Sequence, residues 1–231
     1  PVGINFLEKI QMPHLPSLYG AMLAGAAVVI VGAGIPLEFP AAMAALAEHR
    51  PAAYTLAIAG PRADEPVRVA FDPADLLESG QTRPPLARPA FLPIVSSSTL
   101  ATMLARRLPG ELAGFVIEGP TAGGHNAPPR GQMQLDPAGQ PIYGSRDIPD
   151  LNVFRDLGLP FWLAGGYGSP EKLRQARDLG AAGIQVGTPF ALCAESGLAP
   201  EFRRALVARA RAGTARVFTD PQASPTGFPF K

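Results

Sequence analysis

Residues 114–125, GFVIEGPTAGGH, form a short apolar run that ends in an acidic residue and leads directly into a glycine cluster. The same succession of apolar run and glycine turn recurs in PFWLAGGYGSP at 160–170 and in GIQVGTPF at 183–190. In both recurrences a proline follows the glycines, and proline suits the first turn of a helix. The three segments therefore predict strands that are each followed by a glycine-rich turn, with helices after the last two turns.

Similar apolar runs occur along the rest of the chain and are separated by segments of helical character. Short, nearly continuous apolar strands that alternate with helices are typical of a parallel sheet covered on its faces. The predicted fold class is therefore α/β. The strand candidates are Val2–Phe6, Ala26–Val31, Phe91–Ser96, Gly114–Glu118, Pro160–Ala164 and Gly183–Val186, and the helix candidates are Ser17–Leu23, Ala41–His49, Thr99–Leu108, Asp150–Leu157 and Pro170–Leu179.

Three segments depart from this alternation. Residues 51–90 contain Ala53–Ala59 and Val67–Phe71, which predict a short hairpin inside an insertion between two core units. Residues 120–146 form a long connection with little periodicity, and connections of this length tend to be lids or binding loops. The run after Gly213, which ends in SPTGFPFK, is expected to be a connecting segment.

The composition argues against several classes of protein. With 20 Lys and Arg against 19 Asp and Glu, the net charge is +1, which argues against nucleic-acid binding through neutralised phosphates. The single cysteine, Cys193, excludes a disulfide framework, and its apolar surroundings predict a packed side chain. His14, His49 and His125 lie far apart and form no zinc-binding pair, so no metal site is expected. The sequence shows neither a membrane-spanning apolar stretch nor a secretory signal, so a cytoplasmic protein is expected.

The glycine clusters indicate a ligand site. The chain has 25 glycines but is 47% hydrophobic, which indicates a globular fold with glycine-lined pockets and not disorder. Glycine lets a backbone approach a ligand closely, and helix N-termini direct N–H groups at anions. In a (β/α)₈ barrel the clusters would share the active-site face, and the last two would follow the late strands where phosphate sites form. The alternative is that each cluster is only a turn. A dinucleotide fingerprint at Gly32-Ala33-Gly34 is discounted, because Leu37 stands where its third glycine would be.

Few side chains near these clusters could take part in chemistry. His125 follows the first cluster and could act as a general base, or it could cap backbone groups of its loop. Glu118 could orient a ligand hydroxyl or His125, or it could be a solvated strand end. Asn5, at the end of the first predicted strand, could donate a hydrogen bond to a bound ring or occupy a turn. His14 is expected to be a packing residue. Ser96–Ser98 lack the G-x-S-x-G elbow of an α/β-hydrolase.

Taken in order, six segments resemble the nitronate monooxygenase family, formerly called 2-nitropropane dioxygenases. These segments are VGINF, GAGIP, LPIVSS, FVIEGPTAGGHN, PFWLAGGYGSPE and GIQVGTPFALCAESG. The resemblance covers nearly the whole chain, and its most specific part is AGGH followed by a GG turn and Q-x-G-T-x-F. The family consists of FMN-dependent (β/α)₈ TIM-barrel enzymes related to flavin-dependent enoyl reductases.

The resemblance implies a site. His125, in the AGGH cluster, would be the catalytic acid/base near the flavin N5. Asn5 would contact the flavin, and the last two glycine clusters would hold the FMN phosphate. The expected cofactor-binding residues are Asn5, Glu118, Gly123, Gly124, Gly165, Gly166, Gln185, Gly187 and Thr188.

The resemblance also implies an activity and an extent of the barrel. The expected protein is an FMN-dependent oxidoreductase that oxidises alkyl nitronates or nitroalkanes with O₂, without a nucleic-acid or membrane partner. One alternative is an NAD(P)H-dependent reductase of unsaturated acyl compounds, and another is a non-catalytic module that binds FMN or a phosphate ligand. The six strands correspond to strands three to eight of the barrel. A single domain over 1–231 is therefore expected, incomplete at its N-terminus and with the insertion at about 51–90.

Overall fold

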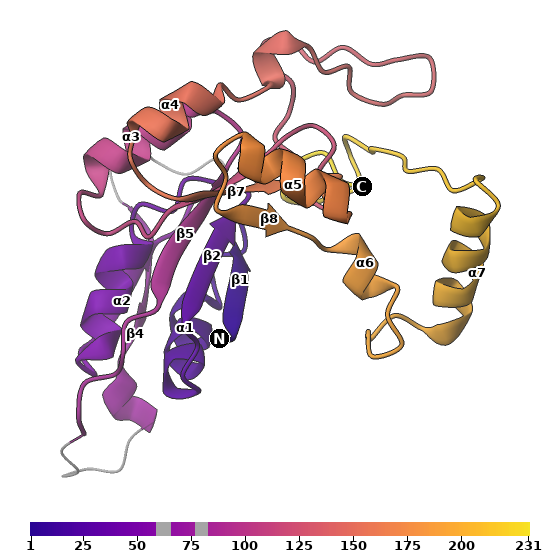
Figure 1. Ribbon diagram of the computed structural model, residues 1–231. Coiled ribbons are helices and arrows are strands. Elements are labelled where there is room, and N and C mark those ends of the chain that lie inside the picture. The colour runs from indigo at the N-terminus through magenta and orange to yellow at the C-terminus, as the bar shows by residue number, and fades with distance from the viewer. Residues whose placement is uncertain (59–65, 77–82) are drawn as a thin grey trace. The chain divides into compact units, whose positions relative to one another are not determined.

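A computed structural model describes residues 1–58, 66–76 and 83–231 (Figure 1). The predicted end of one hairpin strand at Ala59 lies outside the described residues. The chain divides into two compact units. Unit 1 comprises Pro1–Ile94 and Ala101–Phe115, and unit 2 comprises Val95–Leu100 and Val116–Lys231. The division cuts through β5, α3 and β6, so each of these elements is described with the unit that holds most of its residues.

Unit 1 is built on parallel strands in the order β1-β2-β5. Gly3 of β1 lies opposite Val28 of β2, and Val28 in turn lies opposite Ala90 of β5. On β2 the buried Val29 and Val31 alternate with half-buried residues, so one face of the strand is fully covered. The elements are β1 (Gly3–Leu7), α1 (His14–Leu23), β2 (Val28–Gly32), α2 (Phe39–Ala47), β3 (Ala52–Thr55), β4 (Arg68–Phe71), the 3₁₀ turn η1 (Pro73–Leu76), β5 (Ala90–Val95) and α3 (Ser98–Arg107).

The first two helices bury apolar faces with helical spacing. In α1, Leu15, Leu18 and Met22 recur every three or four residues and are buried, together with Tyr19. The α2 helix begins at Phe39 with a proline in its first turn, and its buried residues follow the same spacing. These buried faces supply the core of unit 1.

The predicted hairpin is confirmed. Strands β3 and β4 pair in antiparallel fashion, with Ala52 opposite Phe71 and Thr55 opposite Arg68. The Phe71 ring lies 5.6 Å from that of Tyr19 on α1, so the hairpin packs against the helix layer of unit 1. The segment before β5 is thus part of the compact unit that contains β1 and β2.

Unit 2 carries the glycine turns. Its strands follow in the order β6-β7-β8, and Trp162 of β7 lies opposite Gly183 of β8 in a parallel pair. Ser169 caps α5 as expected for its position before Pro170, because its hydroxyl accepts a hydrogen bond from the Lys172 N–H at 3.2 Å. The elements are β6 (Phe115–Glu118), η2 (Ser145–Asp147), α4 (Leu151–Asp156), β7 (Phe161–Ala164), α5 (Pro170–Asp178), β8 (Gly183–Gln185), α6 (Thr188–Ala191) and α7 (Pro200–Arg211).

The predicted fold class is confirmed: outside the β3–β4 hairpin the strands alternate with helices, and within each unit they follow one another in chain order, with the pairs β1–β2, β2–β5 and β7–β8 parallel. Each of the six strands ends within two residues of its predicted position. The helix α7 was not predicted, and none of its residues is buried. The predicted burial of Cys193 is wrong, because α6 ends at Ala191 and the cysteine lies exposed in the turn that follows. Among the described residues, no helix combines the length and the apolar character that a membrane crossing requires.

Candidate flavin site in unit 2

The site begins at the end of β6. Val116 and Ile117 are buried and anchor the strand, and Glu118 at its end is half-buried. The chain then turns tightly, because the Ala122 N–H donates to the Gly119 carbonyl at 3.0 Å. Ala122 is only 2% exposed, whereas Gly124 adopts a φ of +79°, a conformation that favours glycine. The AGGH segment is therefore a loop that is anchored by the buried Ala122 and that needs glycine at position 124 for its backbone conformation.

The glycine turn after β7 lies directly against this loop. The Thr121 hydroxyl donates to the Gly165 carbonyl at 3.1 Å. A Cβ placed on Gly165 would lie 2.6 Å from the Ala122 nitrogen, closer than real contacts allow. Gly165 also has a φ of +93°. Only glycine satisfies both the close approach and the backbone angle, so this residue holds the first two clusters together.

The third cluster joins the second. A Cβ on Gly168 would lie 3.1 Å from side-chain carbons of both Val186 and Pro189, which flank Gly187. The structure thus brings together three turns that are separated by up to 65 residues in the sequence, from Gly123 to Thr188. All of them belong to unit 2.

These turns leave space on one side. A Cβ added to Gly123, Gly124 or Gly187 would meet no other atom within 4 Å. The Oε1 atom of Gln185, at the end of β8, is buried without a hydrogen-bond partner in the described chain. Open glycine backbone beside an unsatisfied amide is the donor and acceptor set that a ligand with phosphate and amide groups would complete, so the residues fit FMN. Gly187 and Thr188 are exposed at the start of α6, a helix of only one turn.

His125 is held by the end of the chain. Its Nε2 lies 2.7 Å from the Ser224 hydroxyl, and its ring contacts that of Phe230 edge-on at 4.9 Å. The backbone pairs as well, since the Asn126 N–H donates to the Pro229 carbonyl at 2.8 Å. The run after Gly213, which was expected to be a connecting segment, thus also contacts the loop that follows β6. The signal that could have revealed it is SPTG at 224–227, a turn sequence followed by aromatic residues.

Glu118 and Lys231 influence each other near the same loop. The Lys231 ammonium donates to the carbonyls of Pro120 and Ala122, the latter at 2.9 Å. Burial raises the pKa of the Glu118 carboxyl to about 7, and the charge of Lys231 lowers that pKa and so limits the rise. Burial lowers the pKa of Lys231, and the charge of Glu118 opposes that shift. The carboxyl of Glu118 can therefore both hold and release a proton near neutral pH.

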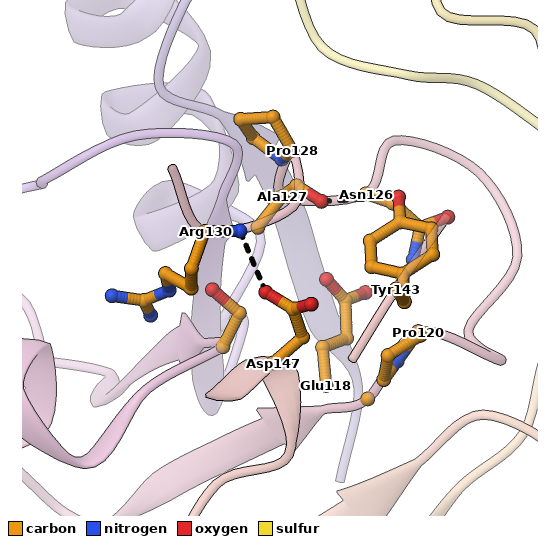
Figure 2. Close-up of a pocket in the computed structure, with 10 residues that line it drawn as sticks. Glu118, Pro120, Asn126, Ala127, Pro128, Arg130, Tyr143 and Asp147 are labelled. Carbon is orange, nitrogen blue, oxygen red and sulfur yellow. Dashed lines mark hydrogen bonds between the residues drawn. The ribbon is translucent and has the colours of Figure 1, made fainter. Parts of the chain in front are cut away.

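A small cavity adjoins Glu118 (Figure 2). Its volume is about 10 Å³, room for one water molecule, and Glu118, Asn126, Tyr143 and Asp147 are among the residues that line it. The Oδ1 atom of Asn126 is buried and lacks a partner among the described residues. Arg130 contributes backbone, donating its N–H to Asp147 Oδ1 at 2.7 Å, while its side chain points away from Glu118 in Figure 2.

The long connection predicted over 120–146 is present. Between β6 and α4 the described chain forms only isolated bridges and the short turn η2. Its outer part doubles back as a narrow arm, in which the Ile142 N–H donates to the Gln134 carbonyl at 2.9 Å (Figure 1). A cleft of about 390 Å³ runs along this arm beside Arg130 and Tyr143.

Asn5 belongs to unit 1 and is placed differently from expectation. It was expected at the end of the first strand, but β1 continues to Leu7, so Asn5 occupies the middle of the strand opposite Ile30. Its side chain is exposed. Its contact with a flavin remains a prediction. In the described residues, no group of three or more His, Cys, Asp or Glu side chains is arranged to hold a metal ion.

Parallel strands in chain order, with glycine turns gathered at the ends of β6, β7 and β8, define an α/β protein of the TIM-barrel type. Residues 85–221 match the family described as nitronate monooxygenase, and the chain belongs to this family. The chain is 36% identical, over 118 residues, to the nitronate monooxygenase of Pseudomonas aeruginosa. The aligned region covers 49% of this chain and 31% of that protein.

A structural relative supports the fold. The chain superposes on a FabK mutant from Thermotoga maritima with a TM-score of 0.54 and 20% sequence identity. The match covers 90% of this chain and 50% of the other. The chain thus spans about half the length of this structural relative and about a third of its Pseudomonas relative.

Proposed function

We propose that this chain is the flavin- and substrate-binding part of an FMN-dependent oxidoreductase that oxidises alkyl nitronates or nitroalkanes with O₂. The observation that carries the proposal is the meeting of three glycine turns beside His125 in unit 2, where Gly165 touches Ala122 and Gly168 touches Val186. Membership of the nitronate monooxygenase family supports the reaction class.

The residues divide between two ends of the cofactor. Gly165, Gly166, Gly187 and Thr188 would hold the FMN phosphate through backbone N–H groups and a hydroxyl. Gly123, Gly124 and Gln185 would contact the ring system, and the unpaired Gln185 Oε1 would gain a partner there. When bound, FMN supplies the electron-accepting and O₂-reducing chemistry that no side chain of this protein provides.

The protein's own part of the chemistry is a proton transfer. A nitroalkane carries an acidic C–H beside the nitro group, and His125 would take this proton at a ring nitrogen as a general base. A nitronate has already lost that proton, so His125 would then serve to donate one to a developing product. Glu118 ends the strand that leads into the same loop, and because burial raises the pKa of its carboxyl to about 7, its charge would change near neutral pH.

Titration of the purified full-length protein with FMN tests the cofactor assignment. We expect a yellow complex with one FMN per chain, and failure to bind FMN would overturn the proposal. Rapid-mixing experiments with the loaded enzyme then test the reaction. Fast bleaching by an alkyl nitronate supports the monooxygenase, fast bleaching by NADPH alone supports the reductase alternative, and no bleaching by either indicates a binding module.

A further inference from the structure

Two hydroxyl residues near the C-terminus, Ser224 and Thr226, form a hydrogen-bonded pair next to His125. The segment Ser224-Pro225-Thr226-Gly227 is a turn, closed by the Gly227 N–H donating to the Ser224 carbonyl at 3.2 Å. Proline at the second position and a φ of +77° at Gly227 suit that turn. The two hydroxyl residues each accept from a backbone N–H two positions on, Ser224 from Thr226 at 3.2 Å and Thr226 from Phe228 at 3.4 Å.

The two hydroxyls also bond to each other and to the histidine. Ser224 Oγ lies 2.7 Å from Thr226 Oγ1 and 2.7 Å from His125 Nε2. The other ring nitrogen, Nδ1, has no hydrogen-bond partner in the part of the chain that the structure describes. One nitrogen of His125 is therefore engaged by the protein, and the other is available.

The backbone keeps this arrangement in register. The Asn126 N–H donates to the Pro229 carbonyl at 2.8 Å, and the Lys231 N–H donates to the Gly124 carbonyl at 3.0 Å. Phe230 packs its ring against the imidazole between these two bonds. Since the loop contains two glycines that would otherwise let it move, these contacts set where the ring points.

We propose that Ser224, supported by Thr226, is a positioning residue for His125 that engages Nε2 and leaves Nδ1 as the nitrogen that exchanges protons with the substrate. The inference rests on the proposed function, in which His125 is the acid/base. It concerns residues beyond 85–221, the part of the chain that matches the family.

The direction of the hydrogen bond between Ser224 and Thr226 is coupled to the position of the proton on His125. A serine hydroxyl has one proton to donate and two lone pairs. When Ser224 donates to Thr226, it accepts from the Nε2–H of His125, and Nδ1 is then bare and acts as a base. When Thr226 donates to Ser224, the Ser224 hydroxyl donates to Nε2, and the proton of the neutral ring is on Nδ1. Ser224 can therefore hydrogen-bond to Nε2 in either neutral form without movement of the ring, and conversion between the two forms requires one proton to leave Nε2 and one to reach Nδ1 through the solvent.

The test uses four variants of the full-length enzyme, namely Ser224→Ala, Ser224→Thr, Thr226→Val and, as a control, Ser196→Ala. Ser196 is a half-buried serine in the turn after α6, and its hydroxyl donates to the Ala191 carbonyl. We expect Ser224→Ala to lower kcat by about 10- to 100-fold, as misplacement of a catalytic group does, with KM and FMN affinity unchanged. Ser224→Thr keeps a hydroxyl and should recover part of the loss, and Ser196→Ala should behave as wild type.

A spectroscopic measurement separates positioning from general damage. In Thr226→Val the Ser224 hydroxyl loses Thr226 Oγ1 as an acceptor, which should shift its donation toward Nε2 and the His125 proton toward Nδ1, a change that ¹⁵N NMR of the imidazole detects with or without FMN. Equal kcat in Ser224→Ala and wild type, or an unchanged imidazole spectrum in Thr226→Val, would overturn the inference. If the wild-type protein does not bind FMN, the proposed function is overturned, and the NMR measurement alone then tests whether Ser224 positions His125.

Discussion

Two histidines stand in comparable places in the two units and have different partners. His14 follows β1 and His125 follows β6, each after the carboxyl end of a parallel strand. His14 is 1% exposed, and its ring lies 4.9 Å from that of Phe39 and 5.1 Å from that of Tyr54. Its Nε2 lies 3.0 Å from the Leu7 carbonyl, which can only accept, so Nε2 must carry the ring proton.

His125 has a partner of another kind. The Ser224 hydroxyl can donate or accept, so both neutral forms of the ring are satisfied, and the side chain is only half-buried. Burial lowers the pKa of His14, which keeps that ring neutral in its aromatic surroundings. The chemistry of the hydrogen-bond partner, and not the position after a strand, therefore distinguishes the packing histidine His14 from His125, which is suited to proton transfer.

The largest expected effect is on kcat and comes from removing the His125 ring. His125→Ala should lower kcat by about 10²- to 10⁴-fold, the usual contribution of a general acid or base. FMN affinity and the free energy of unfolding should change little, because the ring is half-buried at the edge of a loop. Steady-state kinetics with an alkyl nitronate, together with FMN titration, measures both. Wild-type turnover in the variant would show that His125 is not the general acid or base.

The matching change in unit 1 should act on stability instead. His14→Ala deletes a fully buried ring and leaves a cavity, which should lower the free energy of unfolding by about 2–4 kcal/mol. Chemical denaturation measures this loss. Turnover per folded, FMN-loaded molecule should stay near wild type, and a specific loss of turnover would break the distinction drawn between the two histidines.

A second pair of variants tests the contact between the glycine turns. Gly165→Ala places a methyl group against the Ala122 backbone at a φ of +93°, so it should cost about 2–4 kcal/mol and weaken FMN binding. Gly110 of unit 1 has a similar φ of +75° but open space around it. Gly110→Ala should therefore cost only about 1–2 kcal/mol and leave FMN affinity unchanged. Equal losses in the two variants would show that the close approach at Ala122 has no influence.

The smallest effect concerns Glu118. Its pKa in the folded protein, about 7, is above the usual 4.5, so its contribution to stability is complete below pH 4.5 and is lost as pH rises through 7. Over that interval the wild type should lose up to about 3 kcal/mol relative to Glu118→Gln, which carries no charge at any pH. Denaturation at a series of pH values measures the difference. Glu195→Gln, at an exposed position, should keep the wild-type dependence, and parallel curves for Glu118→Gln would refute the raised pKa.

The sequence predicted the elements of the fold well, for a local reason. Apolar runs such as 115–118 and 161–164 are buried on both faces as strands, so their composition and length alone identify them. The cap at Ser169 is likewise a property of adjacent residues. The helix α7 was not among the predicted helices, and none of its residues is buried.

The candidate site was predictable only in part. The three glycine clusters are recognisable in the sequence as turns. The contacts of Gly165 with Ala122 and of Gly168 with Val186, however, depend on the order of the strands. The segment at 224–231 was expected to be a connection, because nothing local to it indicates that Phe230 and Ser224 return to His125. A contact across 99 residues depends on long-range folding, which sequence patterns of a few residues do not encode.

The sequence by itself determined the α/β class, the strand positions, the glycine turns and the one histidine placed beside them, because each follows from the chemistry of neighbouring residues. The tertiary structure decided which turns meet, that Glu118 is buried near a lysine, and that Ser224 engages His125. Those features arise where distant segments exclude water from one another. Burial and hydrogen-bond geometry, the quantities that set proton chemistry, exist only once the chain is folded.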